Sequence, residues 1–307
     1  MNLNVNSINI ILISILSFLF TSVFPASVLA GSHIGVRDKI LNEIKKYDAK
    51  VGVAVIFNGE DTLVVNNEDK YPLMSVFKFH QALAIGNYLQ SKGIGYDSVV
   101  YVSKDELKEN TYSPLRDKYP EGNLNISIAD LLAYTIQLSD NNACDILFDK
   151  IVSVDSTDKY IRSAGIKDFS IEYNEDDMHT DLDNCYKNWS TPLAAVQLLE
   201  LFINGKTVTG AYQDYICRLM TECTTGTARL PFPLKGTNAI IGHKTGTGDK
   251  NKFQRYIGIN DIGFVKLPDG KRYVIAVFVK DSAESFDDTE RIIANISSIV
   301  YDSVNMK

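Results

Sequence analysis

The sequence is short of basic charge and of metal-ligating residues, and it contains no internal repeat. Its 31 lysine and arginine residues face 38 aspartate and glutamate residues, so the net charge is −7 and the pI is near 5.2. This balance argues against nucleic acid or an anionic membrane as a partner. The four histidines show no H-x-H or H-x-x-x-H spacing and form no zinc motif with the four cysteines, so we expect no metal site.

The N-terminal segment lacks the positive charge that usually precedes an apolar leader. Ile8 to Phe24 is almost wholly apolar, and small residues follow up to Ala30. This pattern predicts a signal peptide over residues 1–30 and hence a bacterial protein that is periplasmic or secreted. An uncleaved anchor is the alternative, although the run is short for a span of about 20 residues. In such a compartment a disulfide is allowed, but the sequence leaves its connectivity open.

The 307 residues have ordinary globular composition, with 45% hydrophobic residues and no low-complexity linker. Helical and strand patterns at both ends enclose a mostly helical middle. We therefore expect an α/β (α+β) fold in which an antiparallel sheet flanked by helices, from residues 31–68 plus 222–307, packs beside an all-α lobe of residues 69–221. The expected elements are a helix over 36–47, strands over 50–58, 61–67 and 239–243, helices beginning after Ser127 and Thr191, a hairpin over 261–280 and a helix over 287–304.

The stretch S-V-F-K, Ser75 to Lys78, places a hydroxyl and an amine on one face of a predicted helix. A lysine so placed can take or share the serine proton if its pKa is lowered. The pattern alone is weak, because Ser156 and Lys159 repeat it in a polar segment that we expect at the surface. The apolar residues around Ser75 predict that its own helix is buried.

Two further stretches carry polar groups suited to a small substrate. S-D-N begins at Ser139, at the end of the helix that follows Ser127, and ends at Asn141. K-T-G begins at Lys244 in a strand, where Gly246 permits close backbone approach and the free edge can pair with an extended ligand. Taken alone, S-D-N is better explained as an ordinary polar helix end, and K-T-G as an exposed edge strand with its lysine.

Together and in this order, S-x-x-K, S-D-N and K-T-G resemble the motif set of class A β-lactamases and penicillin-binding proteins. The resemblance covers almost the whole mature chain and implies the β-lactamase and penicillin-binding transpeptidase-like fold. It implies that Ser75 is the nucleophile, that Lys78 is a candidate proton acceptor and that Ser139 relays a proton. It further implies a β-lactam substrate, no cofactor and a monomer.

The same resemblance assigns the substrate contacts. Lys244 and Thr245 would meet the substrate carboxylate, and the strand edge at Gly246 and Thr247 would receive its amide side chain. Asn141 would hold a substrate amide. The N–H groups of Ser75 and Thr247 would form the oxyanion hole.

N-E-D-D-M-H lies between S-D-N and K-T-G, where class A enzymes keep an E-x-x-L-N loop. Glu175 matches the glutamate that activates water, while Met178 and His179 replace the leucine and the asparagine. His179 lies one helical turn from Glu175, so both could hold one water. This departure, and N-W-S at residues 188–190, resemble the PER-like and CfxA-like branch.

Two more residues match the family pattern. In N-T-Y-S-P-L, Tyr112 would form a wall of the cleft, although a half-buried tyrosine would fit the sequence equally well. In T-T-G-T-A-R-L, Arg229 stands where the PER-like branch keeps an arginine that faces the substrate carboxylate; a structural ion pair is the alternative. We expect a secreted serine β-lactamase that hydrolyses cephalosporins and penicillins. A DD-peptidase or penicillin-binding protein, and a non-catalytic β-lactam sensor, are the alternatives.

Overall fold

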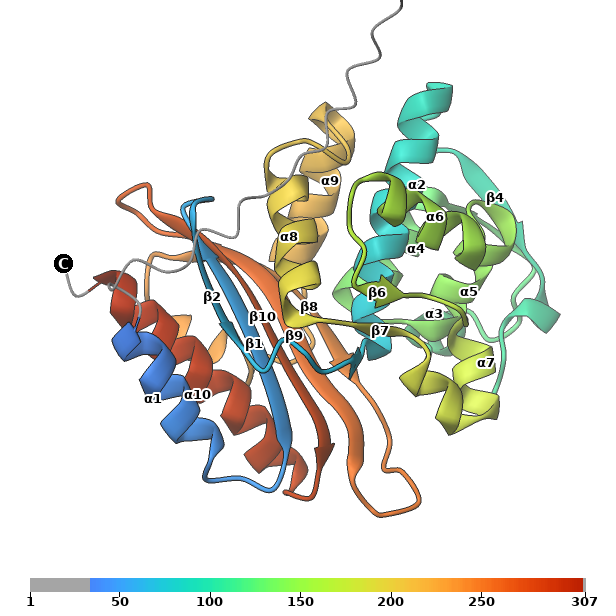
Figure 1. Cartoon of the computed structure of the whole chain (residues 1–307). Helices are drawn as coiled ribbons and strands as arrows, with labels where there is room; N and C mark the ends of the chain where they lie inside the picture. Colours follow the sequence, from blue (N-terminus) through green and yellow to red (C-terminus); the bar gives the residue numbers. More distant parts are fainter. Residues whose placement is uncertain (1–33, 306–307) are drawn as a thin grey trace, which may run out of the picture.

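The computed structural model describes residues 34–305, so the apolar leader and its expected cleavage point lie outside the described residues. Helices (α), short 3-10 helices (η) and strands (β) alternate along the chain (Figure 1). In order they are α1 (Ile34–Ile44), β1 (Lys50–Phe57), β2 (Asp61–Val65), β3 (Tyr71–Pro72), η1 (Met74–Val76), α2 (Phe77–Lys92), β4 (Val99–Val102), η2 (Lys104–Glu106), α3 (Pro114–Lys118), β5 (Leu124–Ser127), α4 (Ile128–Gln137), α5 (Asn141–Lys150), α6 (Val154–Ser163), β6 (Phe169–Ser170), α7 (Glu175–Thr180), η3 (Leu182–Tyr186), β7 (Trp189–Ser190), α8 (Pro192–Ile203), α9 (Gly210–Thr221), η4 (Phe232–Leu234), β8 (Ile240–Thr247), β9 (Tyr256–Lys266), β10 (Arg272–Ser282) and α10 (Phe286–Asn305).

The main sheet has five antiparallel strands in the order β2-β1-β10-β9-β8. Strands from the two ends of the chain therefore share one sheet, which confirms the expected α/β fold. The strand β8 lies at the edge, and its only partner in the sheet is β9. Two smaller sheets, β3-β7-β6 and β4-β5, connect the helices of the middle segment.

Both faces of the sheet are covered by helices. Successive residues of a strand point to opposite faces, and in the central strands the residues on both faces are apolar. Val53 and Val55 of β1 pack in a core with α1 and α10, while Ala54 and Ile56 join a second core that includes α8 and the helical lobe. Figure 1 shows α1 and α10 on one face and α8 and α9 on the other. Gly52 permits close packing here, since a Cβ would lie 2.5 Å from the Tyr71 ring.

The helix α2 forms the centre of the helical lobe and is apolar on nearly all sides. Its Phe77 stacks on Phe148 of α5 with ring centroids 5.8 Å apart, and Phe79 meets Phe202 of α8 edge-on at 5.5 Å. Burial on every side fixes the start of α2, which carries the first sequence motif. Within residues 34–305, none of the helices is long and apolar enough to cross a membrane.

Candidate active site

The serine of the first motif lies one turn before α2. Ser75 belongs to η1, a 3-10 turn that continues directly into α2, so the serine precedes the helix that the sequence predicted for it. The spacing of three residues still brings Lys78 Nζ to 3.1 Å from Ser75 Oγ. Met74, immediately before the serine, has φ of 46°, a left-handed conformation that costs energy for a residue with a side chain.

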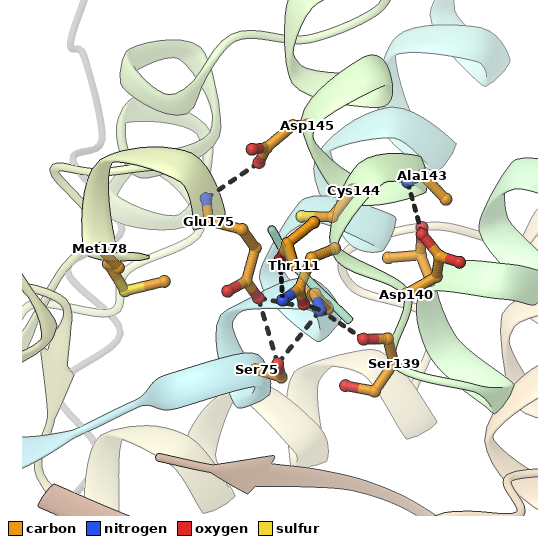
Figure 2. Close-up of polar contacts among 12 residues, drawn as sticks. Ser75, Thr111, Ser139, Asp140, Ala143, Cys144, Asp145, Glu175 and Met178 are labelled. Carbon is orange, nitrogen blue, oxygen red and sulfur yellow. Dashed lines mark hydrogen bonds and ion pairs between the residues drawn. The ribbon is translucent and has the colours of Figure 1, made fainter. Parts of the chain in front are cut away.

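Lys78 is fully buried, and its ammonium group is surrounded by oxygen atoms. It donates to the carbonyl of Ser139 at 2.7 Å and to Asn141 Oδ1 at 2.6 Å, and it lies 2.8 Å from Glu175 Oε1. Ser75 Oγ in turn donates to the same Glu175 oxygen at 3.1 Å (Figure 2). The serine hydroxyl is therefore in contact with a buried amine and with a carboxylate.

S-D-N connects α4 to α5, and its three residues have different tasks. Ser139 follows the end of α4 with φ of 60°, again left-handed. Asp140 is the N-cap of α5 and accepts from Ala143 N at 2.8 Å; it also accepts from Leu115 N at 2.6 Å and from Ser113 Oγ. The aspartate thus anchors the neighbouring loop, while the serine and Asn141 point to Lys78 and Lys244.

K-T-G lies on the edge strand β8 and completes the polar cluster. Lys244 Nζ donates to Ser139 Oγ at 2.8 Å and to the carbonyl of Thr245 at 2.9 Å. Burial, and then the positive charge of Lys78, lower the pKa of Lys244 to about 7. The hydroxyls of Thr245 and Thr225 lie 2.6 Å apart. The second and third motifs therefore meet through a lysine and a serine.

Gly246 allows β8 to approach the serine segment. A Cβ at this position would lie 2.5 Å from the carbonyl oxygen of Leu73, so no other residue fits without moving the backbone. The backbone N–H of Thr247, the next residue, is directed away from the sheet. Gly248 N donates to Gly258 O at 2.8 Å, and successive N–H groups of an extended strand point in opposite directions. The N–H of Thr247 therefore points away from β9.

Glu175 is the first residue of α7, and three contacts fix the start of this helix. Asn174 caps it by accepting from Asp177 N at 2.9 Å, and Asp145 accepts from the N–H groups of Glu175 and Asp176, each at 2.9 Å. Burial, and then the charge of Glu175, raise the pKa of Asp145 to about 7. Met178, at the position of the family's leucine, is buried in the core.

A cleft of about 420 Å³ opens beside these groups. Tyr112 lies at its mouth with 58% of its surface exposed. His179 also lines the cleft and is exposed, but within the described residues no hydrogen bond joins it to Glu175. The lining residues are Met74, Asn110, Thr111, Tyr112, Asn141, Glu175, Met178, His179, Leu182, Cys185, Thr247, Gly248 and Asp249.

Arg229 lies behind the edge strand and does not line the cleft. It is only 2% exposed, and its Nε pairs with Glu290 at 2.9 Å. One terminal nitrogen donates to the carbonyls of Gly246 and Asn260, at 3.0 and 2.9 Å, and the other donates to Thr247 Oγ1 at 2.7 Å. The guanidinium therefore reaches the cleft only through the hydroxyl of Thr247.

Three residues that the sequence did not single out hold the cluster in place. Thr111 Oγ1 accepts from Asn141 Nδ2 at 2.8 Å, which turns the amide oxygen toward Lys78. Asp145 fixes α7, and Thr225 fixes the Thr245 hydroxyl. Thr111 and Thr225 lie within the stretches that named Tyr112 and Arg229, but their own type and spacing carry no signal of a role.

Comparison with known proteins places this geometry in a family. A model of the β-lactamase enzyme family matches residues 35–304. A β-lactamase of Bacteroides uniformis is 40% identical over 273 residues, covering 87% of this chain and 89% of the relative. The extended-spectrum β-lactamase PER-1 of Pseudomonas aeruginosa is 33% identical, with 87% and 86% covered. The crystal structure of a class A β-lactamase from Bacteroides cellulosilyticus superposes with a TM-score of 0.86 at 41% identity, covering 91% of this chain and all of the other.

Proposed function

Since the chain belongs to the β-lactamase enzyme family and to its class A, whose members hydrolyse β-lactam amides, we propose that it does so through an acyl-enzyme on Ser75. The observation that carries this proposal is the position of Ser75 Oγ, 3.1 Å from both Lys78 Nζ and Glu175 Oε1. A hydroxyl placed between an amine and a carboxylate can lose its proton as it attacks a carbonyl carbon.

In the acylation step Ser75 Oγ attacks the lactam carbonyl. Lys78 donates to the serine oxygen in this arrangement, while the serine donates to Glu175, so the carboxylate is the better placed acceptor of the proton. The N–H groups of Ser75 and Thr247 would bind the oxyanion, and each such donor contributes roughly 3–4 kcal/mol in comparable enzymes. Ser139, which touches Lys244, would pass a proton to the lactam nitrogen as the ring opens.

In the deacylation step Glu175 would activate a water against the ester. The start of α7 fixes its position, and it lines the cleft, from which a water can reach it. His179 lines the same cleft, and we propose that it helps to hold this water, although no hydrogen bond joins it to Glu175 within the described residues.

Lys244, Thr245 and Asn141 would bind the substrate, with Tyr112 as a wall at the mouth of the cleft. We infer cephalosporins and penicillins as substrates, since PER-1 and the similar TLA-1 are both described as extended-spectrum enzymes. The apolar leader supports export to the periplasm or secretion, where the enzyme would act as a monomer and confer β-lactam resistance.

The test is Glu175→Gln mixed with a good cephalosporin substrate. Without the carboxylate the attacking water loses the base beside it, whereas Ser75, Lys78 and the oxyanion donors remain in place to open the ring. We expect turnover to fall by orders of magnitude and a covalent adduct on Ser75 to accumulate in intact-protein mass spectrometry. Asp177→Asn, an exposed carboxylate of the same acidic run, is the matched control and should turn over normally.

Two results would contradict the proposal. If the unmodified protein also stays acylated for hours, it acts as a penicillin-binding protein or a sensor. If Glu175→Gln turns over normally, another group supplies the base, and His179 is the first to examine. Ser75→Ala should form no adduct at all, which separates ester formation from tight binding.

A further inference from the structure

A second cluster of reactive groups lies behind the edge strand, outside the proposed catalytic machinery. His243 of β8 is buried, and its Nδ1 lies 3.0 Å from both carboxylate oxygens of Asp261 on β9. The same imidazole hydrogen-bonds the thiol of Cys223, two residues beyond the end of α9. Figure 1 shows α9 alongside β8. A carboxylate, an imidazole and a thiol are thus joined in a row.

This row stabilises the ionised thiol. Burial lowers the pKa of His243, but Asp261 and Cys223 outweigh it and raise the value to about 10, so the imidazole is positively charged at neutral pH. Burial raises the pKa of Cys223, but His243, then Lys244 and Thr225, outweigh it and lower the value. The thiolate is the nucleophilic form of cysteine, and a neighbouring cation increases its population.

The other three cysteines lack such a partner and serve as internal references. Cys144 and Cys185 are buried, and burial raises the pKa of both thiols. Cys217, on α9, and Cys223, just beyond α9, are both half-buried. They differ in that burial raises the pKa of the Cys217 thiol. Cys223 is itself partly exposed and lies between two exposed residues, Glu222 and Thr224, outside the residues that line the cleft.

The thiol is also connected to the substrate side of β8. Cys223 Sγ lies 3.4 Å from Thr225 Oγ1, and Thr225 Oγ1 lies 2.6 Å from Thr245 Oγ1. Two hydrogen bonds therefore separate the thiol from the hydroxyl that would meet the substrate carboxylate. A group added to the sulfur removes the thiol hydrogen and so alters its contact with Thr225.

We propose that Cys223 is a modification site for low-molecular-weight disulfides and that the adduct weakens substrate binding at Thr245. The Cys223 sulfur attacks one sulfur of the disulfide, a new S–S bond forms, and the other half leaves as a thiolate. The reagent is the oxidant, and an added thiol reverses the step. The effect on binding rests on the proposed function; the reactivity of Cys223 does not.

The first test treats the folded full-length protein with an aromatic disulfide that releases a coloured thiolate, followed by peptide mass mapping. We expect one fast thiol that maps to Cys223 and reacts at least roughly tenfold faster than Cys217, since its thiolate is more populated. Cys223→Ser should abolish the fast phase, and the matched variant Cys217→Ser should keep it. His243→Asn should slow the fast phase by an order of magnitude or more. In denaturant, the thiols of His243→Asn and of the unmodified protein should react at equal rates.

The second test compares steady-state kinetics before and after labelling. The labelled protein should show KM raised several-fold for an anionic cephalosporin, with kcat changed less, and dithiothreitol should restore the starting value. Cys223→Ser should not respond to the reagent. A fast phase that maps to Cys217, or no fast phase, overturns the reactive thiol; an adduct on Cys223 with unchanged KM overturns the link to Thr245. Absence of turnover before labelling would refute the proposed function and leave the labelling result standing.

Discussion

At the scale of single residues, Arg229 uses all its nitrogens inside the protein. It pairs with Glu290, donates to two carbonyls and donates to Thr247 Oγ1. The structure therefore contains the ion pair that the sequence left as the alternative, and it connects Arg229 to the cleft through Thr247 rather than directly. The ion pair predicts a large effect on stability, and the hydrogen bond to Thr247 predicts an effect on substrate binding.

We expect Arg229→Ala to raise KM and to lower the free energy of unfolding by about 3–5 kcal/mol, because Glu290 and two buried carbonyls lose their partner. Glu290→Gln is the control, since it breaks the ion pair and keeps the contact with Thr247; it should lower Tm with little change in KM. Thermal melts and steady-state kinetics on several β-lactams measure both quantities. An unchanged KM in Arg229→Ala would reduce the arginine to a structural role.

Lys244 makes the pH dependence of substrate binding predictable. Its pKa is lowered to about 7, so the ammonium that would attract the substrate carboxylate is present below this pH and lost above it. We expect kcat/KM for an anionic substrate to fall as pH rises through about 7, because this parameter reports the free enzyme. Lys244→Arg stays charged throughout and should abolish that fall. A basic limb that persists unchanged in Lys244→Arg would assign it to another group, with Lys78 the first candidate.

At the scale of elements, α7 is the part of the site that depends most on contacts with other segments. It has six residues, so its position depends on contacts from outside. Buried Asn188 accepts from the N–H groups of Glu172 and Tyr173, at 2.8 and 3.0 Å, and donates to the carbonyl of Tyr173 at 2.8 Å. This amide fixes the segment that leads into Glu175.

We expect Asn188→Ala to lower the stability by about 2–4 kcal/mol, since three partly buried backbone groups lose their partner. Deacylation should slow more than acylation, because Glu175 moves while Ser75 and Lys78 stay on α2 and its preceding turn. Single-turnover kinetics separate the two steps. Asn184→Ala is the matched control, because its exposed amide makes one hydrogen bond to α7, with Asp177 O. Equal slowing of both steps would show that Asn188 acts on the whole fold.

The elements that the sequence predicted well are those whose signals are local. Ser127 and Thr191 cap α4 and α8 as expected, by accepting from the N–H groups of Asp130 and Ala194. The apolar pattern of residues 239–243 marked only the first half of β8, and the K-T-G motif that was expected in a strand is its second half, because pairing with β9 extends to Thr247. Pairing between distant strands overrides local propensity, and a single sequence does not reveal it.

The same distinction applies to the site. The motif residues Ser75, Ser139 and Lys244 could be named from spacing and order, and the structure brings their side chains together. The partner of Arg229 could not be named from the sequence, since Glu290 lies 61 positions away and nothing local marks the pair. Helical spacing placed His179 near Glu175, and both residues line the cleft, but the structure has no hydrogen bond between them within the described residues. Spacing fixes the side of a helix, while neighbouring elements decide what a side chain meets.

At the scale of the whole molecule, one ion pair fastens the helical lobe to the sheet. Arg272 of β10 binds both oxygens of Glu200 on α8, at 2.6 and 2.5 Å, and Asn204 adds a third contact. Burial raises the pKa of Glu200, but Arg272 and Asn204 outweigh it and hold the value below 4.5. The ionised form is therefore the one that the folded state prefers.

We expect Arg272→Ala to destabilise the protein by about 3–5 kcal/mol at pH 7, because it leaves a buried carboxylate without its partner. The folded-state pKa of Glu200 is depressed, so this stabilisation is present above pH 4.5 and is lost as the pH falls through the folded value. The difference in free energy of unfolding between the unmodified protein and Arg272→Ala should accordingly become smaller in acid. Denaturant titrations at several pH values would measure it. Lys159→Ala, from an exposed pair with Asp155, should change stability by no more than about 0.5 kcal/mol. A gap that stays constant into acid would show that packing, not charge, holds the lobes together.

The left-handed backbone at Met74 and Ser139 has a consequence for how such a protein evolves. Each position costs of order 1–3 kcal/mol, and both adjoin the atoms that would react. Under selection for thermal stability without antibiotic, mutations that remove the left-handed conformation at these two positions would be favoured. The resulting protein would hydrolyse β-lactams less well when the antibiotic returned. A lineage kept under drug must retain them and therefore tolerates fewer harmful mutations elsewhere, until compensating changes in the distant core restore that tolerance.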